Sequence, residues 1–172
     1  LSYQWHRTSG GQTTNIGGNA STYTLVQLDV GSTITVTITY TDVFAGANQS
    51  VTSAATGAVA NVNDVGVATI AGVATEDQVL TANLSDEDVL PNANNIAYQW
   101  KRGGVNVNNA TNSTYTLVQA DVGAVITVTA SYTDGEGTAE SVTSAATVAV
   151  ANVNDVGAVT ISDTTPTEDQ VL

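Results

Sequence analysis

The chain contains no cysteine and no methionine, and only three of its 172 residues are basic. Without cysteine there is no disulfide, no thiolate metal ligand and no cysteine nucleophile. Three basic residues are too few for the positive surface that nucleic acids and anionic membranes require. No apolar run approaches the roughly 18 residues of a membrane span. We therefore expect no nucleic-acid partner and no membrane insertion in this segment.

Residue types that carry catalysis are also scarce. His6 is the single histidine, and the equivalent position of the repeat described below is Lys101. A serine, histidine and aspartate triad would depend on this one imidazole, so a repeated catalytic site cannot contain it. We therefore predict that the chain is not an enzyme.

Acidic residues, in contrast, are plentiful. Sixteen Asp and Glu against three Lys and Arg give a net charge of −13 at pH 7. This balance favours solubility and the binding of cations. Most of the carboxylates stand in short stretches rich in Gly, Asn and Asp, which are typical of turns.

The sequence repeats with a period of about 92 residues. Ser113–Gln119 reads STYTLVQ, as does Ser21–Gln27, and TEDQVL occurs at both Thr75–Leu80 and Thr167–Leu172. A fixed period marks a tandem array of like modules. Ninety-odd residues suit a small independent domain.

The register of the repeat predicts three segments. Residues 1–66 are expected to be a partial copy that lacks its first strands, 67–157 a complete copy, and 158–172 the first strands of a further copy. We interpret the chain as a window on a longer polypeptide, or as a filament in which 158–172 completes the partial copy of a neighbour.

Strands are predicted throughout the chain, because apolar and polar residues alternate. Thr33–Thr41 places Ile34, Val36, Ile38 and Tyr40 on one face, and Ile126–Thr133 places Ile126, Val128, Ala130 and Tyr132 inward. Further strands are expected at Val67–Ile70, Gln78–Leu84, Ile96–Arg102, Thr114–Val118 and Glu140–Val150. No stretch has a convincing helical period. About seven short strands in each repeat predict an all-β fold of tandem antiparallel β-sandwiches.

Two features favour an immunoglobulin-like sandwich over one of another topology. Trp100 lies in the third strand of the complete copy, where that fold buries a tryptophan between its sheets. Leu117–Gly123 reads LVQADVG and leads into the long alternating strand, as the corner before the sixth strand does. The usual cysteine pair is absent, so we expect aliphatic residues such as Leu80 and Val128 to fill its space.

In such a strand order, three segments distant in the sequence meet at one end of the complete copy. They are the entering linker, the loop after the second strand and the loop after the sixth strand. The turn with Glu76 and Asp77 lies at the opposite end. The candidate ligands are Asn61, Asn63, Asp64, Asp86, Asp88, Asp134 and Glu136, together with Glu76 and Asp77 and, in the following linker, Asn152, Asn154 and Asp155.

Carboxylates that converge in this way repel one another unless a cation neutralises them. Calcium accepts six to eight oxygen ligands in a tolerant geometry, whereas magnesium retains water and zinc favours His and Cys. We therefore predict Ca2+ as the bound cation. The simpler interpretation is that acidic turns only keep the protein soluble.

The sequence resembles the tandem immunoglobulin- or cadherin-like modules of giant bacterial RTX-type surface adhesins. The resemblance rests on TEDQVL, the acids at Asp86–Asp88, YQWKR at Tyr98–Arg102, the run from Ser113 to Thr147, and VANVND. It covers almost the whole chain. It implies an extracellular, calcium-stiffened stalk in cell adhesion or biofilm, whose partners are neighbouring repeats of the same polypeptide.

The resemblance also implies roles for particular acids. Glu76 corresponds to the lone glutamate at the far end of a cadherin domain, Asp86 and Asp88 to the paired aspartates of the next domain, and Asn63-Asp64 to the linker motif. The chain departs from the family at Val65-Gly66, where a proline is usual nearby. The first copy also lacks acids that match Glu136 and Glu140.

Two other functions remain open at this point. A glycan- or ice-binding module would use an exposed aromatic or threonine face, such as Trp5, Trp100 or the row of threonines from Thr33 to Thr39. A solvated strand face and a core tryptophan account for the same residues. Self-association into filaments is the third possibility, through strand donation from 158–172.

Overall fold

The computed structural model describes residues 1–44, 46–162 and 164–171. Within them, the regular elements are β-strands and three single-turn 3-10 helices, and no helix is long and apolar enough to cross a membrane. The strands are β1 Ser2–Ser9, β2 Gln12–Ile16, β3 Thr33–Asp42, β4 Ala47–Thr52, β5 Val67–Ala71, β6 Val79–Ser85, β7 Ala97–Arg102, β8 Val105–Asn106, β9 Thr114–Thr116, β10 Ile126–Thr133 and β11 Ala139–Thr143. The 3-10 helices are η1 Gln27–Asp29, η2 Ala93–Asn95 and η3 Gln119–Asp121. The prediction of an all-β chain is confirmed.

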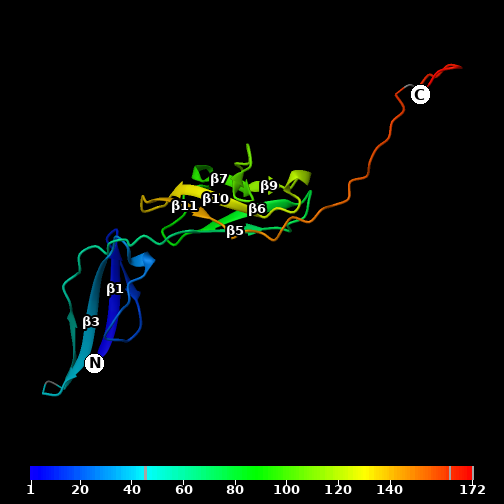
Figure 1. Cartoon of the computed structure of the whole chain (residues 1–172). Helices are drawn as coiled ribbons and strands as arrows, with labels where there is room; N and C mark the ends of the chain where they lie inside the picture. Colours follow the sequence, from blue (N-terminus) through cyan, green and yellow to red (C-terminus); the bar gives the residue numbers. More distant parts are fainter. Residues whose placement is uncertain (45, 163, 172) are drawn as a thin grey trace. The chain divides into compact units, whose positions relative to one another are not determined.

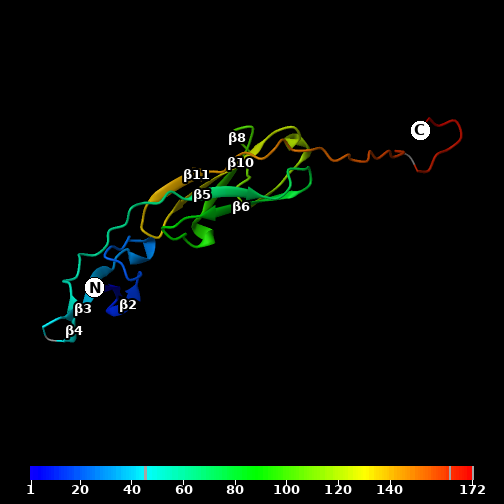
Figure 2. The ribbon, with the colours of Figure 1, turned by 90° about the horizontal axis from the view of Figure 1, so that it is seen from below.

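The strands form three sheets, ordered β2-β1-β3-β4, β11-β10-β7-β8 and β5-β6-β9. Strand β1 pairs antiparallel with both β2 and β3, and β3 pairs antiparallel with β4. Figure 1 shows β1 and β3 side by side, and Figure 2 shows β5 beside β6. The immunoglobulin-like strand order stays a prediction.

The described residues belong to two compact units. Unit 1 contains Leu1–Val67, Leu84–Ile96 and Ser131–Val142, and unit 2 contains Ala68–Asn83, Ala97–Ala130 and Thr143–Leu172. Two segments of the complete copy, 84–96 and 131–142, thus fall in unit 1. The repeat boundaries at residues 66 and 157 stay predictions.

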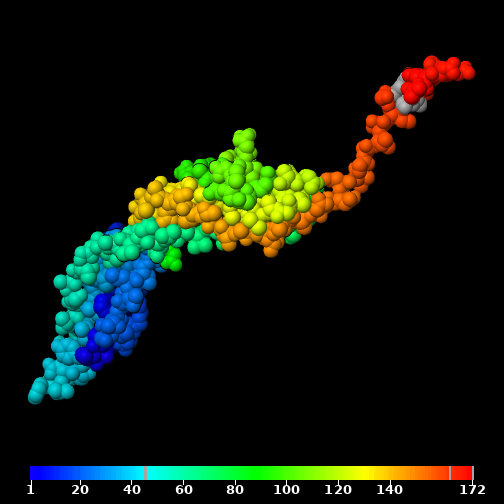
Figure 3. Space-filling view, in the orientation of Figure 1, coloured from blue at the N-terminus to red at the C-terminus, as the bar shows by residue number. Residues whose placement is uncertain are grey.

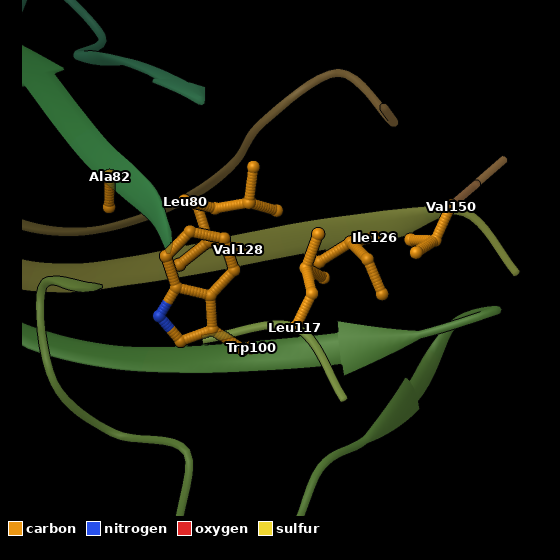
Figure 4. Close-up of a cluster of buried hydrophobic side chains, with 7 residues drawn as sticks. All are labelled: Leu80, Ala82, Trp100, Leu117, Ile126, Val128 and Val150. Atoms are coloured by element: carbon orange, nitrogen blue, oxygen red, sulfur yellow. The ribbon is translucent and has the colours of Figure 1, made fainter. Parts of the chain in front are cut away.

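Unit 2 has a closely packed apolar core between two sheets. Trp100 of β7 is fully buried, and Leu80 of β6 and Val128 of β10 are buried with it. Figure 4 shows both aliphatic side chains beside the Trp100 indole. Leu80 and Val128 thus pack against this tryptophan, as the absence of cysteine led us to expect. Two sheets that share such a core are consistent with a β-sandwich.

The two long alternating strands differ in burial. In β10, Ile126, Val128, Ala130 and Tyr132 are all buried, as the alternation predicts. In β3 only the first residue of the corresponding face, Ile34, is buried, while Tyr40 is 40% exposed. The sequence pattern therefore identified both strands but not how fully each would be covered.

The predicted strand Glu140–Val150 is shorter in the structure and ends at Thr143. After Thr143, side-chain hydroxyl groups accept hydrogen bonds from backbone N–H groups of β10. Ser144 Oγ accepts from the Val128 backbone N–H at 3.1 Å, and Thr147 Oγ1 accepts from the Ile126 backbone N–H at 3.0 Å. These side chains replace backbone carbonyls, so the regular ladder stops.

The described part of the predicted third segment contains no strand. Residues 158–162 and 164–171 are exposed (Figure 3). Positions 163 and 172 of the same segment lie outside the described residues. The assignment of this segment to a further copy stays a prediction.

A buried aspartate organises the corner before β10. Asp121 is fully buried and accepts hydrogen bonds from the Tyr115 hydroxyl at 2.9 Å, the Val118 backbone N–H at 2.8 Å and Arg102 Nε at 2.6 Å. Burial and the bond to Asp121 raise the pKa of the Tyr115 hydroxyl. The first copy repeats this arrangement around Asp29, with Tyr23, Val26 and Arg7.

We expect Asp121→Ala to destabilise unit 2, because Tyr115, Val118 and Arg102 lose the buried acceptor that joins them. Each hydrogen bond lost contributes roughly 0.5–1.5 kcal/mol, and more when it is charged, so the free energy of unfolding should fall by about 2–4 kcal/mol. Urea denaturation measures this change. The exposed carboxylate of Glu168 offers a control, and Glu168→Ala should leave the unfolding free energy unchanged. Equal stability of the two variants would contradict a structural role for Asp121.

Candidate functional site

Three carboxylates of unit 1 approach one another closely. Asp86, Asp134 and Glu140 each offer an oxygen, and these oxygens all lie within 4.8 Å of one another. We refer to these three residues as the acidic cluster. Asp86 follows β6, Asp134 follows β10, and Glu140 is in β11. The ends of three strands therefore bring together residues that are up to 54 positions apart in the sequence.

Asp134 is held by the turn that it begins. Its Oδ1 accepts from the backbone N–H of Glu136 at 2.9 Å and of Thr138 at 2.7 Å, which is the pattern of an Asx turn. The side chain is only 6% exposed, and in the part of the chain that the structure describes its buried Oδ2 has no hydrogen-bond partner. The turn thus fixes one oxygen and leaves the other available to a ligand.

Asp88 repeats this feature beside the cluster. Its backbone N–H donates to Asp86 Oδ1 at 2.8 Å, and its Oδ2 accepts from the Asp64 backbone N–H at 2.8 Å. Asp88 is fully buried, and its Oδ1 is the second buried oxygen without a partner among the described residues. A buried carboxylate oxygen that binds nothing is costly. A cation could satisfy such an oxygen on Asp134, which is in the cluster, and on Asp88, which is bonded to it.

Tyr132 lies between two members of the cluster. Its hydroxyl is 2.5 Å from Asp86 Oδ2 and 2.8 Å from Glu140 Oε2. Burial raises the pKa of the hydroxyl first, and the bonds to Asp86 and Glu140 raise it further. A tyrosine hydroxyl carries one proton and donates one hydrogen bond at a time. It therefore cannot satisfy both carboxylates.

The linker that enters the complete copy is bound to the same cluster. Glu140 accepts from the Gly66 backbone N–H at 2.8 Å and from Asn63 Nδ2 at 2.8 Å. The bond from Gly66 and then that from Asn63 lower the pKa of the Glu140 carboxyl. Glu140 is therefore charged at neutral pH while it holds the linker.

Within the part of the chain that the structure describes, no ion pair neutralises the cluster. The ion pairs of the described residues are Arg7 with Asp29 and Arg102 with Asp121, and neither includes a residue of the cluster. Negative charges as close as 4.8 Å repel one another. Three such pairs oppose the arrangement unless a cation binds.

The donor set suits a hard divalent cation. The available groups are the carboxylate oxygens of the cluster and Asp88 Oδ1. Calcium accepts six to eight such ligands, and carboxylates, carbonyls and water all serve. The cluster could therefore hold a metal ion of this class.

The structure brings several of the predicted ligands together. Asp86 and Asp134 are in the cluster, Asp88 and Asn63 contact it, and Asp64 reaches Asp88 through its backbone N–H. Two other predicted ligands of this end do not join them. Asn61 Oδ1 instead accepts from Gln27 Nε2 at 3.2 Å. The Glu136 side chain is exposed.

The remaining predicted ligands lie in unit 2. Glu76 is 2% exposed, and its Oε2 accepts from the Val153 backbone N–H at 3.1 Å, so this buried carboxylate lies against the second linker. Asn152 Oδ1 accepts from Gln119 Nε2 at 3.1 Å. Asn152 is exposed, as are Asp77, Asn154 and Asp155.

Glu140 and Tyr132 were not among the predicted site residues. Two signals pointed to them. The alternation of the strand already placed Tyr132 on the inner face, and the first copy has Gln49 where the complete copy has Glu140. An acid that appears in one copy only is a sign of a site in that copy.

Comparison with known proteins identifies no family. No protein-family model matches the chain, and no curated protein matches it. The function therefore has to be inferred from the geometry of the cluster and from the repeat.

Gly66 provides a test of the linker's attachment. A Cβ at Gly66 would lie 1.8 Å from the Tyr132 hydroxyl oxygen and 3.1 Å from Asp86 Oδ2. We expect Gly66→Ala to displace the linker from Tyr132 and to lower the free energy of unfolding by about 1–3 kcal/mol, as overpacking does. Urea denaturation followed by circular dichroism measures this.

The equivalent glycine after the complete copy is a matched control. Gly157 has the same place in the repeat, and a Cβ there meets no atom within 4 Å. Gly157→Ala should therefore leave stability unchanged. Equal effects of the two substitutions would mean that the linker does not pack against Tyr132 in solution.

Proposed function

We propose that this chain is a structural, non-enzymatic module of an extracellular fibre or bacterial surface adhesin, stiffened by Ca2+ where repeats join. One observation carries the proposal. Asp86, Asp134 and Glu140 gather within 4.8 Å beside the linker between copies, and among the described residues Asp134 Oδ2 and the Oδ1 of the neighbouring Asp88 are buried without partners. A cation that neutralises the cluster would also order the linker.

In this proposal Asp86, Asp134 and Glu140 hold the calcium ion, with Asp88 Oδ1 as a further oxygen. Calcium supplies positive charge and accepts several oxygens at once. The residues of the chain do the rest. Asp134 is oriented by its own turn, and Glu140 also binds Asn63 and Gly66. Linker and strand ends then share one charged centre, which restrains bending of the linker.

The linker that follows the complete copy, with Asn152, Asn154 and Asp155, supports the proposal that such joints recur along the chain. Glu76 is buried against Val153, and Asn152 is held by Gln119. In the repeat, this linker stands where Asn63 and Asp64 stand in the first. The cadherin-like resemblance implies the same pattern: a glutamate at the end of one copy and paired aspartates in the next.

An extracellular location agrees with the proposed affinity range. Extracellular calcium modules bind with a Kd of about 10⁻⁴–10⁻³ M. The high negative charge and the resemblance to RTX-type adhesins point in the same direction. The partners in this proposal are the neighbouring repeats.

The glycan- and ice-binding alternatives gain little support. Trp100 is fully buried, so its indole is not available to a sugar. In the row of threonines, Thr37 Oγ1 bonds to Thr52 Oγ1 at 2.9 Å and to His6 Nε2 at 3.0 Å. Hydroxyls that bond within the protein do not present a free array to ice or glycan.

We expect calcium to stabilise the chain against heat. At about 10 mM calcium, roughly 10–100 times the expected Kd, the stabilisation is about 1.4–2.7 kcal/mol for each site. Differential scanning calorimetry should show a melting temperature several degrees higher in calcium than in chelator. Magnesium at the same concentration is the control and should give a smaller shift. Identical melting in calcium and chelator would contradict the proposal.

Asp134→Asn removes the negative charge of the side chain but keeps the hydrogen bonds of its turn. The amide oxygen can still accept from the N–H groups of Glu136 and Thr138, so the turn is retained. We expect the calcium-dependent rise in melting temperature to shrink or disappear, while the stability in chelator is unchanged or higher because repulsion is relieved. Asp42→Asn, at the equivalent position of the first copy, should leave the response to calcium intact. Loss of the response in both variants would place the cation elsewhere.

A further inference from the structure

Two loops of unit 1 are joined by a single backbone donor next to the acidic cluster. The Gly135 N–H donates to the Asp88 carbonyl at 3.0 Å and to the Val89 carbonyl at 2.8 Å. Gly135 lies in the turn after β10, and Asp88 and Val89 lie in the loop after β6. We refer to this shared hydrogen bond as the clasp. It connects two loops that are distant in the sequence.

The clasp requires glycine at position 135 because of space. A Cβ at Gly135 would lie 2.9 Å from the Asp88 carbonyl oxygen and 2.9 Å from Val89 Cβ. Both distances are well inside van der Waals contact, which is about 3.5–4.0 Å between carbon atoms. Gly135 is not in the left-handed region. The need for glycine therefore comes from the closeness of the two loops, and a side chain here would push them apart.

On the other side of the clasp, Val89 has an unusual backbone conformation. Its φ is 68°, in the left-handed region that a β-branched residue rarely adopts. The Val89 side chain is 61% exposed, so its burial does not account for this conformation. Backbone strain persists where the surrounding structure holds it. Here the carbonyls of Val89 and of the preceding residue both accept from Gly135, so the clasp holds the strained backbone.

Each side of the clasp directly follows a buried acid. Val89 follows Asp88, and Gly135 follows Asp134. These two aspartates are 0% and 6% exposed. In the described part of the chain, the buried side-chain atoms without a hydrogen-bond partner are Asp88 Oδ1 and Asp134 Oδ2. The clasp therefore ties together the backbones of the two acids that have an oxygen to spare.

The other oxygen of each acid already fixes the orientation of its side chain. Asp134 Oδ1 accepts from the backbone N–H groups of Glu136 and Thr138, and Asp88 Oδ2 accepts from the backbone N–H of Asp64. These bonds set the direction of each carboxylate relative to its own surroundings. The clasp sets the separation of the two loops, and with it the separation of the two unpartnered oxygens.

The first copy links this glycine to the acids of the site. Gly135 corresponds to Val43, although Asp42 keeps the aspartate before it. The same turn of the first copy also lacks acids that match Glu136 and Glu140. Between the two copies, the glycine thus accompanies the full set of acids.

We propose that Gly135 and Val89 are positioning residues for the cation. The clasp holds Asp88 and Asp134 at a fixed separation, with their unpartnered oxygens in place before the cation arrives. Repulsion between crowded carboxylates would otherwise drive the two loops apart. A site that is arranged in advance loses less entropy when it binds. This inference rests on the calcium site proposed above.

Titration of Gly135→Ala tests the separation of the loops. Partners that support metal ligands typically change metal affinity about 10–100-fold, so we expect the calcium Kd to rise roughly tenfold or more. Terbium, a luminescent substitute for calcium, is excited through a nearby tyrosine, and the Tyr132 hydroxyl is bonded to two acids of the cluster. Competition of calcium against terbium on the full chain then gives the calcium Kd.

Gly18→Ala is the matched control. Gly18 is also outside the left-handed region, and a Cβ there meets no atom within 4 Å. Its calcium Kd should equal that of the unaltered chain. Equal Kd values for Gly18→Ala and Gly135→Ala would overturn the proposal.

Two substitutions at Val89 test the clasp from the other loop and do not depend on the folding of Gly135→Ala. Proline fixes φ at about −65°, so Val89→Pro should break the clasp and raise the calcium Kd roughly tenfold or more. Asparagine adopts the left-handed region more readily than valine, so Val89→Asn should recover the affinity that Val89→Pro loses.

Urea denaturation of the same variants in chelator distinguishes positioning from a merely structural role. If Gly135→Ala and Val89→Pro lower the unfolding free energy but bind calcium as the unaltered chain does, the clasp is structural only and the proposal is wrong. That result would leave the calcium joint intact. If the unaltered chain itself binds no calcium, the joint and the clasp proposal both fail.

Discussion

Carboxylates that are crowded at the end of a β-sandwich are the constraint on which this structure depends. Three acidic side chains meet within 4.8 Å, and among the described residues one oxygen of Asp134 and one of the neighbouring Asp88 are buried without partners. Neither the single proton of Tyr132 nor any basic side chain among the described residues neutralises them. Such an arrangement could hold a metal ion, whose positive charge would neutralise it. The linker is bound to the same carboxylates, so the charge state of the cluster and the position of the linker are coupled.

Buried aspartates serve two different purposes in this chain. Asp121 and Asp29 are each matched by a tyrosine, a backbone N–H and an arginine, so their charge is neutralised within the protein. Asp88 and Asp134 use one oxygen for backbone donors and leave the other without a partner. The first pair stabilises the corners of the fold, and the second pair is suited to an external cation. A buried aspartate whose oxygens both have hydrogen-bond partners is a structural acid, whereas one with an unpartnered oxygen is a candidate ligand.

The repeat shows how strongly context acts on one sequence. STYTLVQ occurs twice, and Leu117 in the second occurrence is fully buried while Leu25 in the first is half exposed. Only the second is covered by β6, which also converts residues 114–116 into a strand. Burial is a property of the pair of surfaces, so no reading of this heptapeptide alone could have predicted it.

By itself, the sequence determined the all-β class, the inward face of β10 and the meeting of Asp86 with Asp134, because alternation and repeat register are encoded locally. It gave no measure of which carboxylate oxygens would remain unpartnered, and it left Glu140 and Tyr132 out of the site. The tertiary structure decided these points, since hydrogen-bond partners such as Gly66 for Glu140 come from segments 74 positions away. It also decided in which copy the core is buried. Leu117 is buried because β6 packs over it, whereas the identical heptapeptide leaves Leu25 half exposed.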